Sequence, residues 1–317
     1  MIDIFCSTRM KCALDRLKLN SDHPKDISEL TSRCDSLMRL GKFSKAAKCY
    51  DKVLELDPKS GTAWTRKGDS LSNLRKYREA IRCYDKAVEL DPENAVAWNN
   101  KGKVFQNLFG KRFDAIECYD KAIELDPGYA EAWYNKGAIL TNWGEYGKAD
   151  FCFDKVIELD PKSFNAWNGK FVMNERLIML NFANTQAWNN KGRALRNLGR
   201  HNDAIRAFDV SIEYDSRSAA AWYNKGVALY DLKRYAEAIE CYDKATSLDH
   251  SFEKAWYAKG LALAFQAEHE KAIKAFDTAI RINPKCAKAW RAKGLSFRAL
   301  GHTFEADLAF AMASGIG

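Results

Sequence analysis

The chain has 317 residues, of which 47% are hydrophobic and 29% charged, a composition typical of a soluble, well-packed protein. Six prolines and eighteen glycines exclude a collagen-like or low-complexity chain, and no apolar run is long enough for a membrane span. The net charge of +8 is spread along the chain without a basic block, so nucleic-acid binding is not favoured.

The first 26 residues lack the continuous apolar core of a secretory signal and carry charges throughout. We therefore expect a cytoplasmic protein. Within this segment Met10, Ala13, Leu14 and Leu17 have helical spacing. Residues 1–26 are a candidate capping helix for the structure that follows.

From residue 27 onward the chain repeats itself. Successive tryptophans are 34 or 35 residues apart, except for one interval of 21, at positions Trp64, Trp98, Trp133, Trp167, Trp188, Trp222, Trp256 and Trp290. In the unit AVAWNNKGKVFQNL, Trp98, Gly102 and Phe105 form a helical stripe, and DAIECYDKAIELDP has the same periodicity. A Leu-Gly or similar turn separates the halves, and Asp-Pro ends the second. Each unit is predicted to be a helical hairpin.

The period and the pattern W-x3-G-x2-[LF]…A-x3-[YF]-x2-[AVS]…P resemble the tetratricopeptide repeat. The resemblance covers residues 27–317 and implies an all-α solenoid of hairpins wound into a right-handed superhelix. Four repeats are expected in 27–163, a truncated repeat in 164–184 and four more in 185–317. Such proteins are typically non-catalytic and bind partners on the concave wall formed by their first helices.

Physical reasons account for the residues that every copy keeps. One Ala of the second helix is present in all eight copies, and a Gly of the first helix in seven, as expected where helices approach too closely for a larger side chain. The residue before that Gly is always Lys, at 67, 101, 136, 191, 225, 259 and 293. Each Lys either lays its aliphatic stem along the helix and exposes its amine, or contributes to a functional row of cations.

The short interval lies in FNAWNGKFVMNERLIMLNFANTQAW, from Phe164 to Trp188. Thirteen residues are missing relative to a full repeat, and Phe171 stands where Gly should permit close packing. We expect residues 164 to about 180 to form one amphipathic helix instead of a hairpin. Because one unpaired helix breaks the alternation of a two-layer solenoid, the axis should change direction there.

The sequence contains no motif that indicates catalysis or metal binding. It has no phosphate-binding or nucleophile motif, its five His residues lack metal-ligand spacing, and its carboxylates are predicted to form a solvated face. Five of the nine cysteines share one repeat position before an aromatic residue, and there is no C-x-x-C. We expect nine free thiols, no metal, no cofactor and no enzymatic activity.

Binding specificity should lie where the first helices differ between copies. By resemblance to the concave wall of the family, the candidate peptide-binding residues are Tyr134, Tyr223, Tyr230, Lys254, Tyr257, Arg291 and Arg298. Aromatic side chains flanked by cations suit a peptide with apolar and acidic groups. A further position holds Asn100, Asn135, Asn190 and Asn224, which either bond the backbone of a peptide or are exposed polar residues. No repeat carries the Lys and Asn pair of the carboxylate clamp that binds chaperone tails.

The prediction is a scaffold that binds protein or peptide partners in its grooves. The alternatives are a regulatory subunit of a separate enzyme and, less favoured, a protein that binds RNA or another anionic polymer. The segment AFAMASGIG leaves Phe297, Phe310, Met312 and Ala313 without a following helix, so we also expect association through this edge, either as a homo-oligomer or with a partner.

Overall fold

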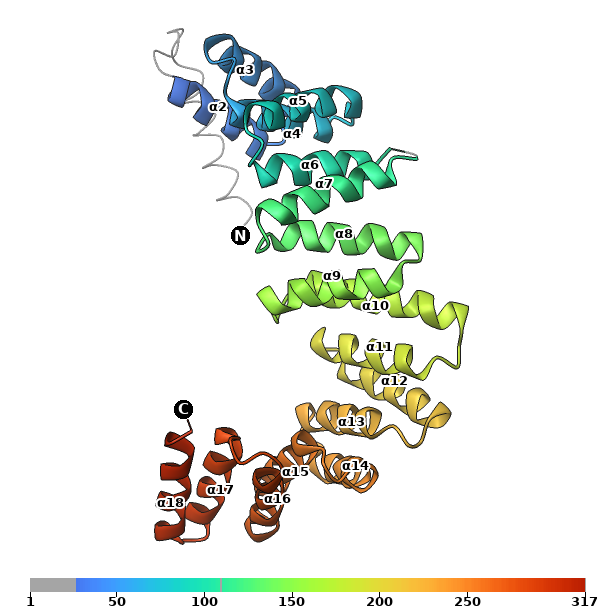
Figure 1. The fold of residues 1–317 in the computed structure, drawn as a ribbon, viewed down its shortest axis with the longest axis vertical. Coiled ribbons are helices and arrows are strands. Elements are labelled where there is room, and N and C mark those ends of the chain that lie inside the picture. Colours follow the sequence, from blue (N-terminus) through green and yellow to red (C-terminus); the bar gives the residue numbers. More distant parts are fainter. Residues whose placement is uncertain (1–26, 109, 317) are drawn as a thin grey trace, which may run out of the picture. The chain divides into compact units, whose positions relative to one another are not determined.

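The computed structural model describes residues 27–316 except residue 109, and all regular structure in them is α-helical. Contacts divide the chain into two compact units, residues 1–132 and 133–317, with the boundary inside α8 (Ala130–Trp143). The expected all-α solenoid of helical hairpins is confirmed (Figure 1). The candidate capping helix in residues 1–26 lies outside the described residues.

In the first unit three hairpins follow one another, and the second helices of the first two pack on the first helix of the next hairpin. Their helices are α2 (Ile27–Arg39) and α3 (Phe43–Leu56), α4 (Gly61–Asn73) and α5 (Tyr77–Leu90), and α6 (Ala95–Gln106) and α7 (Arg112–Leu125).

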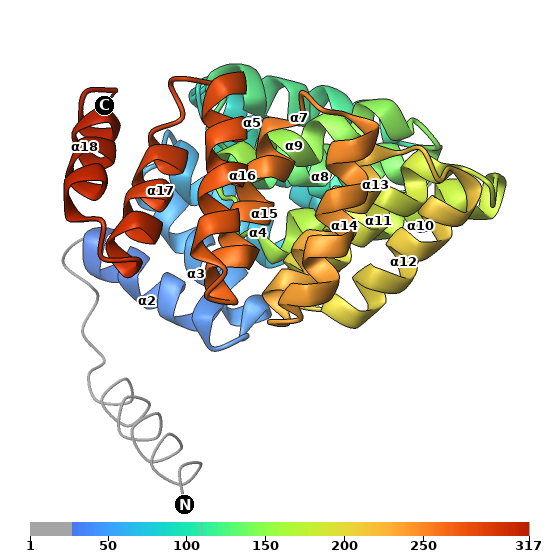
Figure 2. The same ribbon diagram turned by 90° about the horizontal axis from the view of Figure 1, so that it is seen from below.

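The second unit continues with α9 (Tyr146–Leu159) and the single helix α10 (Phe164–Leu180). Four hairpins follow α10, and Figure 2 shows the last of them, α17 with α18, side by side. They are α11 (Thr185–Asn197) with α12 (His201–Tyr214), α13 (Ala219–Asp231) with α14 (Tyr235–Leu248), α15 (Glu253–Phe265) with α16 (His269–Ile282), and α17 (Ala287–Ala299) with α18 (Thr303–Ser314).

Local sequence determines where the helices start and how the repeats join. Ser60, for example, caps α4 by accepting a hydrogen bond from the Ala63 amide, an N-cap interaction that satisfies a free helix-end donor. The indole of Trp64 donates to the Pro58 carbonyl at 3.0 Å, and the same bond six residues back recurs in later repeats. In these repeats the Trp therefore links the first helix to the turn that precedes it.

The repeated Gly permits contact between the two helices of a hairpin. A Cβ atom added to Gly192 would lie 2.5 Å from Cε1 of Phe208, and one added to Gly260 would lie 2.4 Å from Cε1 of Phe276. The repeated Ala residues of the second helices, such as Ala204, are fully buried. The packing reason inferred from the sequence is thus the one that the structure shows.

Most of the repeated Lys residues pair their ammonium groups with acidic side chains. Lys67 pairs with Asp51 at 2.6 Å and Lys225 with Asp209 at 2.6 Å, and in each case the Asp lies on the second helix of the preceding repeat. The Lys67 ammonium also lies 5.0 Å from the ring centroid of Trp64. Equivalent pairs recur along the chain, so these cations and carboxylates join consecutive repeats and are not merely a solvated face.

The helix α10 combines the roles of both helices of a repeat. Its N-terminal half behaves as a first helix, because Lys170 pairs with Asp154 of α9 at 2.8 Å, and a Cβ added to Gly169 would lie 2.5 Å from Phe153. Its C-terminal half behaves as a second helix, because Glu175 accepts from Lys191 of α11 at 3.0 Å. Loss of thirteen residues has fused two helices into one. The expected change of axis direction stays a prediction.

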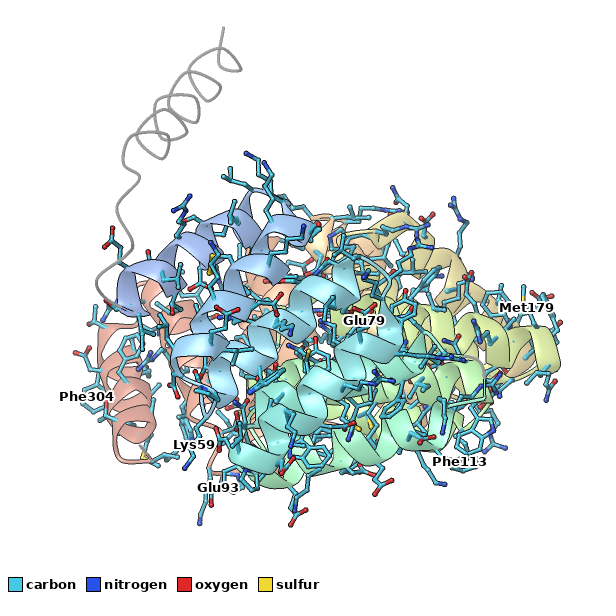
Figure 3. The ribbon with its side chains drawn as sticks, turned by 90° about the horizontal axis from the view of Figure 1, so that it is seen from above. Lys59, Glu79, Glu93, Phe113, Met179 and Phe304 are labelled. Carbon is cyan, nitrogen blue, oxygen red and sulfur yellow. A yellow bond between two sulfur atoms is a disulfide. The ribbon has the colours of Figure 1, made fainter. Side chains whose placement is uncertain are left out.

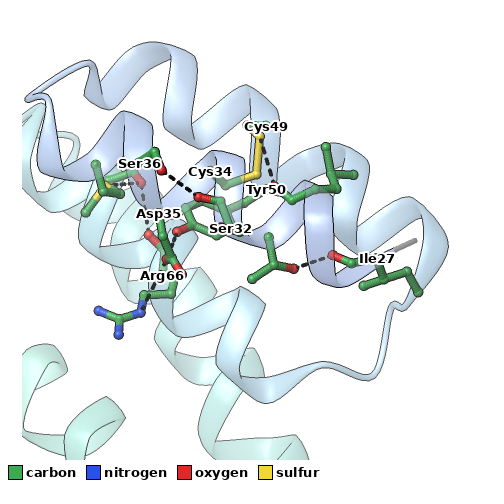
Figure 4. The surroundings of a disulfide bond; sticks show 12 residues. Ile27, Ser32, Cys34, Asp35, Ser36, Cys49, Tyr50 and Arg66 are labelled. Carbon is green, nitrogen blue, oxygen red and sulfur yellow. Dashed lines mark hydrogen bonds and ion pairs between the residues drawn. A yellow bond between two sulfur atoms is a disulfide. The ribbon is translucent and has the colours of Figure 1, made fainter. Parts of the chain in front are cut away.

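The prediction that all nine cysteines are free thiols is wrong. Cys34 of α2 and Cys49 of α3 form a disulfide, with their Cα atoms 5.4 Å apart (Figure 4). Cys34 occupies the Gly position of the first repeat, which faces the second helix closely, so a Cys there meets the Cys of the opposite helix. Disulfides persist mainly in oxidising compartments, and the expected cytoplasmic location stays a prediction.

Candidate functional site

The candidate residues of the second unit form stripes along α13, α15 and α17. On α13, Tyr223 and Tyr230 lie two turns apart and both are half-buried. The ring of Tyr223 is 4.9 Å from that of Phe252, and Tyr230 makes an edge contact with Tyr235 at 5.3 Å. Burial raises the pKa of both phenols, so they remain neutral hydrogen-bonding groups on an apolar surface.

On α15 the stripe contains Tyr257, Leu261 and Phe265, at spacings of four residues. Sequence reasoning missed Phe265, whose ring stacks on Tyr235 at 5.2 Å while 62% of the residue remains exposed. The signal was present, because the same repeat position holds Asn or Asp in most other copies. Exposed aromatic residues held by neighbouring rings are suited to contact a partner.

On α17 two cations flank an apolar residue. Arg291, Leu295 and Arg298 occupy one helix face, and all three are exposed. The Arg298 guanidinium lies 4.7 Å from the ring centroid of Phe310 and 3.9 Å from Asp307, whereas Lys254 of α15 is exposed. These contacts leave the cations at the edge of the surface, where they can meet an acidic group.

Between α15, α16 and α17 lies a pocket of about 210 Å³. Leu261, Phe265 and Leu295 contribute to its apolar wall, and His269 and Ser296 also line it. The His269 Nδ1 and Ser296 Oγ atoms are buried without a hydrogen-bond partner in the described part of the chain. The aromatic stripes of α13 and α15, the cations of α17 and this pocket together form what we call the aromatic surface, within residues 223–298.

The Asn residues have partners inside the fold where their contacts are described. Asn100 donates to Asp69 at 2.9 Å, and Tyr84 donates to the same carboxylate oxygen at 2.8 Å. Burial raises the pKa of Asp69. Asn99, which is buried beside Asn100, donates to the Tyr129 hydroxyl at 3.2 Å. In the first unit, then, polar residues of the first helices bond across to neighbouring helices.

The remaining candidates lie in the second unit. Asn224 donates to Asn189 at 3.0 Å, Asn190 accepts from Gln186 at 3.3 Å, and the Tyr134 ring lies 6.0 Å from Phe153. Asn135 of α8 also has interactions within the protein. A role of these amides in binding a peptide backbone stays a prediction.

Within the described residues no group of three or more His, Cys, Asp or Glu side chains is arranged to hold a metal ion. None of the helices in the described residues has both the length and the hydropathy of a membrane span.

Models of the tetratricopeptide repeat match most of the chain between residues 29 and 163 and again between residues 189 and 286. Matches described as "Tetratricopeptide repeat" cover residues 29–60, 62–94, 83–115, 130–163, 189–250 and 253–286, and one described as "TPR repeat" covers 110–144. The chain belongs to the tetratricopeptide-repeat family, and its membership supports a role in protein–protein interaction. No curated protein matches it.

Several solved structures are similar to this chain. A crystal structure of MamA is 26% identical over 57% of this chain and 93% of its own, with a TM-score of 0.42. YrrB, described as a TPR protein with an unusual peptide-binding site, is 23% identical over 67% of this chain and 98% of its own, with a TM-score of 0.36. A tetratricopeptide repeat protein from Parabacteroides merdae is 18% identical over 86% and 98%, with a TM-score of 0.43.

Proposed function

We propose that this protein is a non-catalytic scaffold that binds peptides or helices of partner proteins on the aromatic surface. The observation that carries the proposal is the exposed ring of Phe265, held by Tyr230 and Tyr235 beside an apolar pocket. Aromatic anchors beside a pocket usually supply most of the binding energy of such a contact.

The charge of the surface selects the ligand. Arg291 and Arg298 are separated by two helical turns, with the exposed Leu295 between them. An extended or helical peptide that places an apolar side chain on Leu295 would bring its flanking residues near the two guanidinium groups. Acidic residues at those places should be preferred, and this preference should weaken with added salt.

A selection from a random peptide library, with the full-length chain as bait, tests the proposal. We expect enriched peptides to combine an aromatic or aliphatic residue with Asp or Glu. Phe265→Ala and Tyr257→Ala should each weaken a selected peptide by about 2 kcal/mol, or roughly thirtyfold.

The control is Tyr214→Ala, which removes an exposed Tyr from α12, outside the aromatic surface. Peptides that bind all three variants as tightly as the unchanged chain would show that the aromatic surface is not the binding site.

A further inference from the structure

A second groove lies in the first unit, on the hairpin of α2 and α3, and we call it the basic groove. It encloses about 490 Å³. Leu30, Leu37, Leu40 and Cys49 supply its apolar lining. Five cations surround this lining, and no carboxylate is among the lining residues: Arg33, Lys42, Lys45, Lys48 and Lys52.

These five cations differ from most others that the repeats place at equivalent positions. Within residues 27–316 none of them forms an ion pair, whereas the equivalent of Arg33 in later repeats pairs with an acidic residue of the preceding helix. Because the five positive charges around the apolar lining repel one another, the groove favours an anionic ligand.

The second unit contains an equivalent groove of about 510 Å³, which the preceding helix α14 helps to line. On α15 and α16, Trp256, Lys259 and Leu263 stand in the register of Leu30, Arg33 and Leu37 of the basic groove. There the preceding helix α14 contributes the rest of the wall, through Ala236, Ile239 and Asp243.

Two of the three cations that line the equivalent groove are paired with carboxylates. Lys259 pairs with Asp243 at 2.5 Å, and Lys271 pairs with Glu268. In the basic groove the position of Glu268 holds Lys42, and that of Thr278 holds Lys52. A helix more acidic than α14 should therefore bind the basic groove more tightly than a copy of α14 does.

We propose that the basic groove binds an acidic amphipathic helix of a partner protein, seated as α14 is seated on α15. Such a helix presents small or aliphatic residues at i and i+3, a carboxylate at i+7 facing Arg33, and further acidic residues toward Lys42, Lys45, Lys48 and Lys52. Residues 1–26 of the chain itself are a poorer match, because they contain five Lys or Arg and four Asp.

The probe is a synthetic peptide that copies residues 235–249, is stapled into a helix on its outward face and carries a fluorophore. Fluorescence polarisation measures its binding to the full-length chain at low salt. We expect saturable binding that weakens as salt is raised, and a loss of about tenfold or more in the Arg33→Glu, Lys45→Glu double variant.

The matched control reverses two cations of the equivalent groove, Lys259→Glu with Lys271→Glu, which correspond to Arg33 and Lys45, and should bind as the unchanged chain does. A peptide with Asp243→Lys should bind the unchanged chain less well and recover part of its affinity for the double variant. This exchange of charges separates a direct contact with Arg33 from a general loss of positive charge.

Three results would overturn the proposal. The first is no saturable binding by the unchanged chain, or equal binding by the double variant. The second is tighter binding after Met10, Leu14 and Leu17 are changed to Ser, which would show that the chain's own N-terminal segment fills the groove. The third is displacement of the peptide by single-stranded RNA at lower concentration than by unlabelled peptide, which would assign the groove to a polyanion.

Discussion

At the scale of single residues, one substitution in one repeat changes covalent structure. In most repeats a Gly of the first helix lies about fifteen residues before the second-helix position that holds Cys83, Cys118, Cys152 or Cys241. Only the first repeat has a Cys at both ends of this spacing, and the separation of Cys34 from Cys49 is 15. The same close approach that requires Gly elsewhere therefore produces a disulfide here.

The disulfide should stabilise the first hairpin. Closing a loop of this length contributes about 3 kcal/mol in the chain-entropy model. We expect peptide mapping without reductant to recover Cys34 and Cys49 linked, and reduction to speed hydrogen exchange in α2 and α3. In a Cys34→Gly variant, which has the residue of the other repeats, reductant should leave the exchange unchanged. Recovery of both cysteines as separate alkylated thiols from the unreduced protein would contradict the linkage.

Four of the free thiols are buried at one repeated position of the second helices, and we expect their reactivity to be low. Cys83, Cys118, Cys152 and Cys241 are buried, whereas Cys286 is partly exposed. Burial raises the pKa of Cys83 and of Cys241 to about 11, and that of Cys118 to about 12.

We predict that iodoacetamide at pH 8 alkylates Cys286 much faster than Cys83, Cys118 or Cys241 in the folded protein, because little thiolate forms at the buried positions. Mass spectrometry of the tryptic peptides measures each rate, and denatured protein provides the control in which all four should react alike. Because the folded state keeps the Cys83 proton to higher pH, the free energy of unfolding should fall as pH rises from about 9 to about 11. Equal rates in the folded protein would exclude the protection.

At the scale of helices, contact between Gly and an aromatic ring positions the two helices of a hairpin, and a Gly to Ala change tests it. Gly192→Ala should lower the free energy of unfolding by about 1–3 kcal/mol, because its Cβ would lie 2.5 Å from Phe208. Gly147→Ala on α9 is the matched control, since a Cβ there meets no atom within 4 Å. It should be neutral or stabilise by up to about 1 kcal/mol. Urea unfolding of both variants decides, and equal destabilisation would remove the packing explanation.

The sequence predicts those features of the helices that are determined by residues close together in the chain. The Trp interval indicates the hairpins, and the shortened interval with Phe171 predicts α10 as one helix, because both features are periodic along one chain segment. The substitution of Gly169 for the missing packing Gly, and the pairing of Lys67 with Asp51, depend on which helix lies opposite. Those contacts depend on how the preceding repeat is aligned against the helix. Periodicity within one repeat does not specify this alignment.

The sequence likewise predicts only part of the aromatic surface. Tyr223, Tyr230 and Tyr257 can be selected from the sequence because they occupy positions that differ between the repeats and that the family uses for binding. Phe265 belongs beside them because Tyr235 of another helix stacks on it. In the sequence the cations of the basic groove form no continuous basic block. The hairpin of α2 and α3 brings five of them around one apolar surface.

At the scale of the molecule, the two compact units are proposed to bind different ligands. The aromatic surface of residues 133–317 combines rings with a few cations, whereas the basic groove of residues 1–132 is dominated by positive charge. A ligand of the aromatic surface should depend mainly on apolar contacts and lose less affinity with added salt than a ligand of the basic groove. Together they would let one scaffold hold two partners without competition for a site.

Self-association is a further property of the whole molecule, and α18 is the proposed surface. Phe304, Leu308 and Met312 form an exposed stripe on this helix, at 78%, 57% and 44% exposure, and Figure 3 shows Phe304 at the surface. Of the residues expected at this edge, Met312 is exposed as anticipated. Ala313 is buried, and Phe310 packs against Gly294, where an added Cβ would lie 2.7 Å from its ring.

We therefore predict that the chain associates at micromolar concentration through this stripe, because a row of three apolar side chains on one helix face favours burial in an interface. Light scattering should give a mass above that of one chain, and Phe304→Glu with Leu308→Glu should return it to the mass of a monomer. Phe113→Glu is the control, since Phe113 is an equally exposed apolar residue on α7, at 69% exposure, and its substitution should leave the mass unchanged. A monomeric unchanged chain would refute the association, and loss of mass in the control as well would assign it to surface hydrophobicity in general, not to α18.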